Sequence, residues 1–214
     1  MKDTAGIPPF WMNSGPLPSL SCAVLLIAAS NRLSYALIAG SALVFVYTAV
    51  SAILKLAERA IPPTYAILIR VVTASAAASV FAAIAGALWP LAVRDLAFYI
   101  GAVPLCLLSS GLLDRAARLT PLRTVRASAE ESIGIACMLV ALALVREPFG
   151  FGALSLPAKD GLKLYFSSEK AVEVSLRSLS AVAGGFILLG YFLALFRRIK
   201  SRLYGSPSCS EDRP

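Results

Sequence analysis

Two cysteines, Cys22 and Cys106, are the residues whose type and setting best suit metal chemistry. Each follows a proline and opens an apolar run, within Pro16-Leu-Pro-Ser-Leu-Ser-Cys-Ala-Val-Leu-Leu26 and within Gly101-Ala-Val-Pro-Leu-Cys-Leu-Leu-Ser-Ser-Gly111. The chain contains no histidine, so thiolates are its only soft ligands. If the protein holds a metal centre, these two cysteines are the candidate ligands.

The settings of the other two cysteines do not indicate metal binding. Cys137 lies in the apolar run Gly134-Ile-Ala-Cys-Met138, where we expect a thiol to pack as a small hydrophobic side chain. Cys209 lies in the polar tail Ser206-Pro-Ser-Cys-Ser210, as expected of a cytoplasmic thiol. On residue type alone, the packing role also remains open for Cys22 and Cys106.

The elements that must position these residues are membrane helices. Over 214 residues the chain is 58% hydrophobic and 15% charged, with a mean hydropathy of +0.77, far more apolar than a soluble domain. A helix needs about 20 apolar residues to cross a bilayer. Uncharged stretches of suitable length run over 33–54, 71–89, 96–113 and 178–196.

Two further apolar runs, 17–30 and 132–145, are shorter. The second reaches membrane length if its helix begins near Arg126, which places Glu130 and Glu131 close to its start and to the headgroups. On this interpretation no segment carries a carboxylate at mid-membrane. That absence disfavours an autonomous proton or cation pump built on Asp or Glu.

The run 17–30 is preceded by several prolines, so a short half-membrane helix is expected there. The segment around Cys106 is likewise interrupted, by Gly101 and Pro104. Short, interrupted segments at corresponding positions of two halves point to a functional centre between inverted repeats. The sequence predicts one all-α integral membrane domain, 1–214. Its six segments form two inverted three-helix repeats, about 12–90 and about 91–205, with a cytoplasmic tail at 203–214; the first and fourth segments are short or half-helices.

Small residues and charge pairs suggest how the helices pack and where they end. The stretch 65–89 is rich in Ala and Ser, which predicts a helix buried among others. Further close-contact faces are expected at Gly40 with Ser41, and at Gly184, Gly185 and Gly190. The adjacent opposite charges Arg94-Asp95 and Arg146-Glu147 are interpreted as membrane boundaries, and 146–177 as an ordered loop.

The net charge of +8 is distributed unevenly. With six segments, both termini lie on one side, which collects most of the Lys and Arg, so both termini are predicted to be cytoplasmic. The basic excess suits anionic lipid headgroups, and no nucleic-acid partner is implied. The early prolines and the lone early cation, Lys2, do not fit a signal peptide, so we expect the first segment to be retained.

Three stretches resemble one known family. Arg146-Glu-Pro-Phe-Gly-Phe-Gly-Ala-Leu-Ser155 is similar to an Arg-Glu-Ile-Leu-Gly-x-Gly-Thr-Leu signature, and Gly185-Phe-Ile-Leu-Leu-Gly-Tyr-Phe-Leu-Ala194 to a final helix. Ser30-Asn-Arg-Leu-Ser-Tyr-Ala-Leu37 also fits. These features belong to the E subunit of Rnf electron-transport complexes and the related D subunit of the sodium-pumping NADH:quinone reductase. The resemblance covers roughly residues 11–202.

The resemblance implies a subunit of an ion-translocating oxidoreductase complex in the bacterial inner membrane. It implies pairing with a homologous A-type subunit, each chain giving two cysteines to one 2Fe-2S cluster, with Cys22 and Cys106 as this chain's share. Electrons would cross the membrane, coupled to movement of Na⁺ or H⁺. The settings depart from the family's Gly-Leu-Cys-Pro and Thr-Asn-Cys motifs, being Ser-Leu-Ser-Cys22-Ala and Pro-Leu-Cys106.

Two alternatives remain open. One is a redox-silent scaffold subunit of the same complex, in which both cysteines are replaceable. The other is the membrane component of a small-solute transporter, since apolar helices without a P-loop, dinucleotide fingerprint or nucleophile elbow also describe such proteins. We expect no enzymatic activity from the chain alone, because catalysis belongs to the assembled complex and its soluble cofactor-bearing partners.

Overall fold

Long helices dominate the computed structural model, which describes residues 26–57, 62–109, 121–151, 153–158, 161–167 and 181–204. Within these residues, four helices are long and apolar enough to cross a membrane, and a shorter apolar helix covers Val182–Leu195. The predicted all-α polytopic membrane fold is thereby confirmed. The elements are, in order, η1 (Ala28–Asn31), α3 (Leu33–Ala57), η2 (Pro63–Tyr65), α4 (Ala66–Leu88), α5 (Pro90–Ser109), α7 (Pro121–Phe151), β1 (Ala153–Ala158), β2 (Gly161–Ser167) and α10 (Val182–Tyr204).

The predicted spans match these helices, with three earlier starts, of which one is α4, which begins at Ala66 instead of residue 71. α3 contains 33–54, and α7 contains 132–145. However, α5 begins at Pro90 instead of residue 96, and α7 at Pro121 instead of Arg126. Proline suits the first turn of a helix, where its missing N–H has no partner to lose and its fixed φ is already helical. Both prolines indicated the helix starts, which a hydropathy pattern does not detect.

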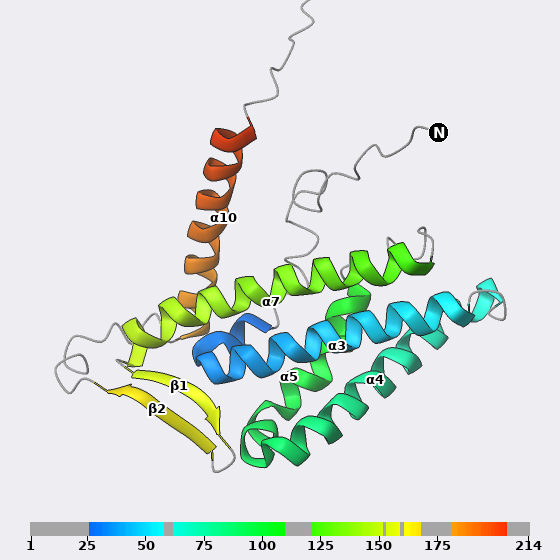
Figure 1. Ribbon diagram of the computed structural model, residues 1–214, viewed down its shortest axis with the longest axis horizontal. Helices are drawn as coiled ribbons and strands as arrows, with labels where there is room; N and C mark the ends of the chain where they lie inside the picture. Colours follow the sequence, from blue (N-terminus) through cyan, green and yellow to red (C-terminus); the bar gives the residue numbers. More distant parts are fainter. Residues whose placement is uncertain are drawn as a thin grey trace, which may run out of the picture.

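Helices α3 and α7 lie side by side and run antiparallel as the central pair (Figure 1). They approach each other closely at Gly40, where an added Cβ would lie 3.1 Å from the Ala136 Cβ. A residue without a side chain is what lets two membrane helices approach to this distance. The predicted contact role of Gly40 is confirmed, whereas Ser41 is exposed.

Helix α4 packs on α3 and α5 at the edge of the bundle (Figure 1). The expectation that it is buried among other helices is wrong for this chain. Its buried residues are Ala74, Ala77, Ala78 and Ala85, and most of its larger apolar side chains are exposed. The small residues do form the contact face, but they form only one stripe, and the opposite stripe suits lipid.

Helix α5 continues through Gly101 and Pro104 to Ser109 as one helix of 20 residues. The expected interruption of this segment is therefore corrected. Pro104 removes one backbone N–H and leaves the rest of the hydrogen-bond ladder in place, which neighbouring helices in a membrane can tolerate. Residues 110–113, the end of the predicted span, lie outside the described residues.

The region predicted as an ordered loop, 146–177, contains helix and strand where the structure describes it, and residues 152, 159–160 and 168–177 lie outside the described residues. Its first residues complete α7, and β1 and β2 then form an antiparallel hairpin with an irregular register between Leu154 and Ser155. The hairpin packs beside the start of α3 (Figure 1), where the Ser34 and Ser155 hydroxyls lie 3.3 Å apart. Hydrogen bonding between the strands satisfies backbone groups that an open loop would expose.

Helix α10 projects away from the other helices (Figure 1), with its main contacts to η1 and α7. Its first turns carry the buried residues Gly184, Gly185 and Leu189, whereas Gly190 is exposed, unlike the prediction. The predicted first segment, 17–30, is described from Leu26 onward, and Leu26 and Ile27 are fully buried. The division into two inverted repeats stays a prediction.

Candidate functional site

Cys106 lies near the end of α5 and is fully buried. It belongs to the main core cluster together with Val103 and Leu107, and its carbonyl oxygen accepts a hydrogen bond from Ser109 Oγ at 3.1 Å. Cys22 lies outside the described residues, so the predicted meeting of the two cysteines stays a prediction. Cys137, expected to pack in the interior, is instead exposed on α7. Cys209 lies outside the described residues.

The available metal-binding side chains determine which metal centre the described residues could hold. Among them there is no group of three or more Cys, Asp or Glu residues placed to bind a metal ion. A 2Fe-2S cluster takes about four protein ligands. One buried thiol fits a centre that other residues and another subunit complete, and it does not fit a centre held by the described residues alone.

The Arg146-Glu147 pair is the most deeply buried charged group of the described chain. Arg146 is 0% exposed and Glu147 is 2% exposed. Both side chains are thus enclosed by the protein, and their position at a membrane boundary stays a prediction. Buried charges are costly unless they are hydrogen-bonded, and these two meet backbone groups that need partners.

The Arg146 guanidinium joins two segments far apart in the sequence. Its Nη1 donates to the Ile27 carbonyl at 2.8 Å and to Ser30 Oγ at 2.9 Å, and its Nη2 donates to the Ala181 carbonyl at 3.0 Å. The Ser30 hydroxyl in turn donates to the Ile27 carbonyl at 2.7 Å. The carbonyls that end the first segment and precede α10 are thus satisfied by one side chain.

Glu147 caps the start of helix α3. Its Oε2 accepts a hydrogen bond from the backbone N–H of Leu33, the first residue of α3, at 2.9 Å. The first N–H groups of a helix have no intrahelical acceptor and carry the positive end of the helix dipole, so a carboxylate is the favoured partner. Adjacent residues of α7 therefore cap the end of one segment and the beginning of the next.

The absence of a side chain at Gly185 makes room for this arrangement. A Cβ added there would lie 2.8 Å from Ile27 Cγ2 and 2.9 Å from Arg146 Nη1, closer than real Cβ contacts. The predicted close-contact role of Gly185 is confirmed, with the difference that its partner is a charged group. Glycine lets the guanidinium lie against the backbone of α10.

A second buried polar pair lies further along the α3–α7 interface. Tyr47, which is fully buried near the middle of α3, donates its hydroxyl to Glu131 Oε2 at 2.6 Å. Glu131 is 7% exposed. The expectation that Glu131 lies close to the start of its helix is wrong, because α7 begins at Pro121 and the residue is buried well inside the helix. That no segment carries a carboxylate at mid-membrane stays a prediction.

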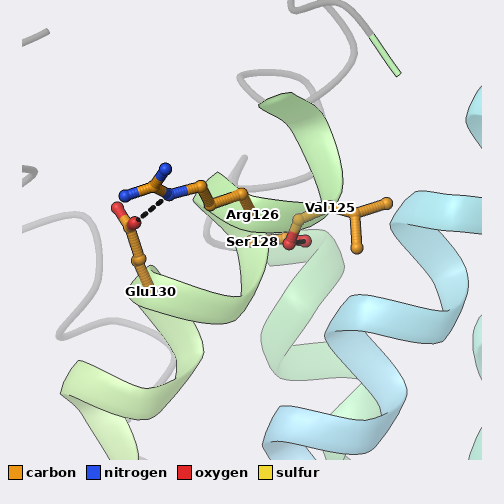
Figure 2. A network of polar contacts seen from close by, with 4 residues as sticks. All are labelled: Val125, Arg126, Ser128 and Glu130. Atoms are coloured by element: carbon orange, nitrogen blue, oxygen red, sulfur yellow. Dashed lines mark hydrogen bonds and ion pairs between the residues drawn. The ribbon is translucent and has the colours of Figure 1, made fainter. Parts of the chain in front are cut away.

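The first turns of α7 carry an exposed charge pair, which contrasts with the buried charges near the end of the same helix. Arg126 Nε lies 2.8 Å from Glu130 Oε1, with side chains 82% and 56% exposed (Figure 2). In the same turns, Ser128 Oγ donates to the Val125 carbonyl at 2.9 Å (Figure 2). An exposed pair of this kind contributes little to stability. Arg126 and Arg146 thus provide an exposed and a buried arginine on one helix.

Sequence reasoning identified Arg146, Glu147 and Glu131 as charges but misjudged their surroundings. The signal for Glu131 was Pro121, since a helix starting there carries the carboxylate inward. No signal in the sequence indicated the role of Arg146 and Glu147, because the turn at 31–32 that leaves backbone groups without helical partners is seen only in the structure. The signal at Pro121 is not visible in a hydropathy profile.

A known protein family matches most of the chain. The family described as Rnf-Nqr subunit, membrane protein, matches residues 17–194. No individual curated protein matches. The matched region includes Cys22, Cys106, the Arg146-Glu147 pair and the start of α10. The chain therefore belongs to the Rnf-Nqr family of membrane subunits.

Proposed function

We propose that this chain, as a membrane subunit of an Rnf/Nqr-type complex, helps to hold an intramembrane 2Fe-2S cluster and to pass electrons across the membrane, coupled to Na⁺ or H⁺ movement. The observation that carries the proposal is the complete burial of Cys106 within a chain whose family match spans both predicted ligands. When bound, such a cluster supplies one-electron transfer at a potential set by burial and by hydrogen bonds near its sulfurs.

The chain's own contribution is to hold the thiol of Cys106 away from water. Val103 and Leu107, which flank it on α5, are fully buried. Cys22 and Cys106 would be this chain's ligands, and the homologous A-type subunit would complete the set. Both termini would lie in the cytoplasm of a bacterium, with the complex in its inner membrane. Activity belongs to the assembled oxidoreductase, because soluble partners must supply and accept the electrons.

A redox-silent scaffold is the second candidate, and one observation favours it. Cys106 is buried within this chain's own apolar core cluster, where a thiol also packs well as a small hydrophobic side chain. A scaffold subunit would keep the fold and the partner surfaces without a bound cluster. The two candidates differ in whether Cys106 is needed for iron.

The test is to co-purify the chain with its homologous partner under anaerobic conditions and to measure iron and the reduced-state EPR spectrum. We expect about two irons per pair in the wild type, and loss of the EPR signal in Cys106→Ser. Cys137→Ser is the matched control, because Cys137 is exposed on α7, and it should keep the signal. If the wild-type pair contains no iron after reconstitution, the cluster hypothesis is refuted and the scaffold hypothesis remains. If the EPR signal survives in Cys106→Ser, Cys106 is not a ligand of the cluster.

A further inference from the structure

The chain turns between η1 and α3. Ser30 has non-helical backbone angles, φ −79° and ψ 15°, and Arg32 is extended, with φ −129° and ψ 143°. The chain thus leaves one segment and enters the next within a few residues, none of which is fully exposed. In a membrane protein the backbone groups exposed by such a turn need partners within the protein.

Arg146 and Glu147 supply these partners with matching signs. The cation meets the carbonyl of Ile27, at the negative end of the first segment, and the anion meets the amide of Leu33, at the positive end of α3. Each charge therefore complements the dipole that it faces. A swap of the two residues would place like charge against each dipole end, so the order Arg-Glu is itself part of the arrangement.

The second nitrogen of the guanidinium extends the contact to α10. Arg146 Nη2 binds the Ala181 carbonyl, which also accepts a hydrogen bond from the backbone N–H of Gly185 at 3.3 Å. A planar guanidinium reaches two separated acceptors in a fixed geometry, which a lysine ammonium cannot reproduce. The end of the first segment is thereby held to the start of the last helix.

We infer that Arg146 is a positioning residue that holds the end of the cysteine-bearing first segment against the start of α10, while Glu147 fixes the start of α3 from the same turn of α7. Cys22 precedes Ile27 in the same apolar run, so displacement of Ile27 moves the chain that carries this predicted ligand. The effect on the cluster rests on the proposed function, whereas the clamp between the segments does not.

The test compares Arg146→Met with Arg126→Met in the purified complex, by hydrogen exchange of residues 28–36 and 182–188. We expect exchange on the order of tenfold faster in both regions for Arg146→Met, as for loss of a helix cap, and no change for Arg126→Met. Arg146→Lys should fall between the wild type and Arg146→Met. Unchanged exchange in Arg146→Met would overturn the clamp, whether or not the complex holds iron.

Measurements on the iron-sulfur cluster then test whether Arg146 positions the segment that carries Cys22. In a complex with wild-type iron, Arg146→Met should alter the reduced EPR spectrum or shift the reduction potential, while Arg126→Met should not. Faster exchange with an unchanged spectrum and potential would refute the effect of Arg146 on the cluster, while the clamp between the first segment and α10 would still be supported. An iron-free wild type would refute both the proposed function and the positioning step, with the exchange data still deciding the clamp.

Gly185→Ala is the second variant if Arg146→Met does not assemble. It keeps the arginine but places a methyl group against the guanidinium and Ile27, so it should speed exchange in the same two regions. Gly190→Ala is its matched control, because a Cβ there meets nothing within 4 Å. Equal exchange in the two glycine variants would overturn the clamp by an independent route.

Discussion

The hydrogen bond between Tyr47 and Glu131 allows a quantitative test of the α3–α7 interface. Tyr47→Phe removes one oxygen and keeps the aromatic ring, so packing in the fully buried site changes little. What is lost is a 2.6 Å hydrogen bond to the Glu131 carboxyl group, which is itself buried. The variant therefore weakens the interface through the polar contact.

The expected magnitude follows from two general observations. Hydrogen bonds to charged groups contribute about 1.5–3 kcal/mol in proteins. Interhelical hydrogen bonds in membranes contribute less, about 0.6 kcal/mol on average and up to about 1.7, because the unfolded state also finds partners. For a short bond at a fully buried tyrosine we expect a coupling free energy of about 1–2 kcal/mol between Tyr47 and Glu131.

The measurement is a double-mutant cycle in the free energy of unfolding. Tyr47→Phe, Glu131→Met and the double variant are unfolded by SDS in mixed micelles, followed by circular dichroism. Methionine keeps the length of the glutamate side chain without an acceptor. Tyr191→Phe is the matched control, because Tyr191 is 74% exposed, and it should be neutral. Single-variant effects that add to within about 0.5 kcal/mol would refute the reasoning, since independent sites behave that way.

Two further predictions concern the same helix pair, each with a matched control and the same unfolding assay. Gly40→Ala should destabilise by about 1 kcal/mol net, because the new methyl group meets Ala136 at 3.1 Å and this cost exceeds the gain in helix propensity. Gly86→Ala, where nothing lies within 4 Å, should be neutral or slightly stabilising, and equal effects at the two glycines would contradict the close approach. Glu147→Gln keeps an acceptor for the first amide of α3 but loses the negative charge, so it should cost about 1 kcal/mol. The exposed Glu130→Gln should cost less than half of that, and a reversed order would show that Glu147 is not a cap.

The membrane helices could be predicted because each is a local property of the sequence. The stretch 33–54 is uncharged and long enough to span a bilayer, and its backbone hydrogen bonds are satisfied within the helix whatever surrounds it. α3 accordingly contains the predicted span. The starts of α5 and α7 were missed because hydropathy averages over a window, whereas a proline acts at one position.

Side-chain roles were harder to predict because they depend on neighbours distant in sequence. Glu147 and Leu33 are 114 residues apart, and Tyr47 and Glu131 are 84 apart. A hydropathy scale assigns a charge the same cost whether it faces lipid or a helix end, so it gave no indication of the buried partners of Arg146. The small residues of α4 predicted contact correctly, but their number suggested burial on all sides instead of along one stripe.

The sequence by itself determined that this is a helical membrane protein, where its main spans lie, and which residues could serve as soft metal ligands, because composition, length and residue chemistry are local properties. The tertiary structure alone decided that Arg146 and Glu147 are interior caps, that Gly185 makes room for a guanidinium, and that Glu131 is a buried partner of Tyr47. The physical reason is that a polar group in an apolar interior takes its role from the partner it meets, and that partner is supplied by folding.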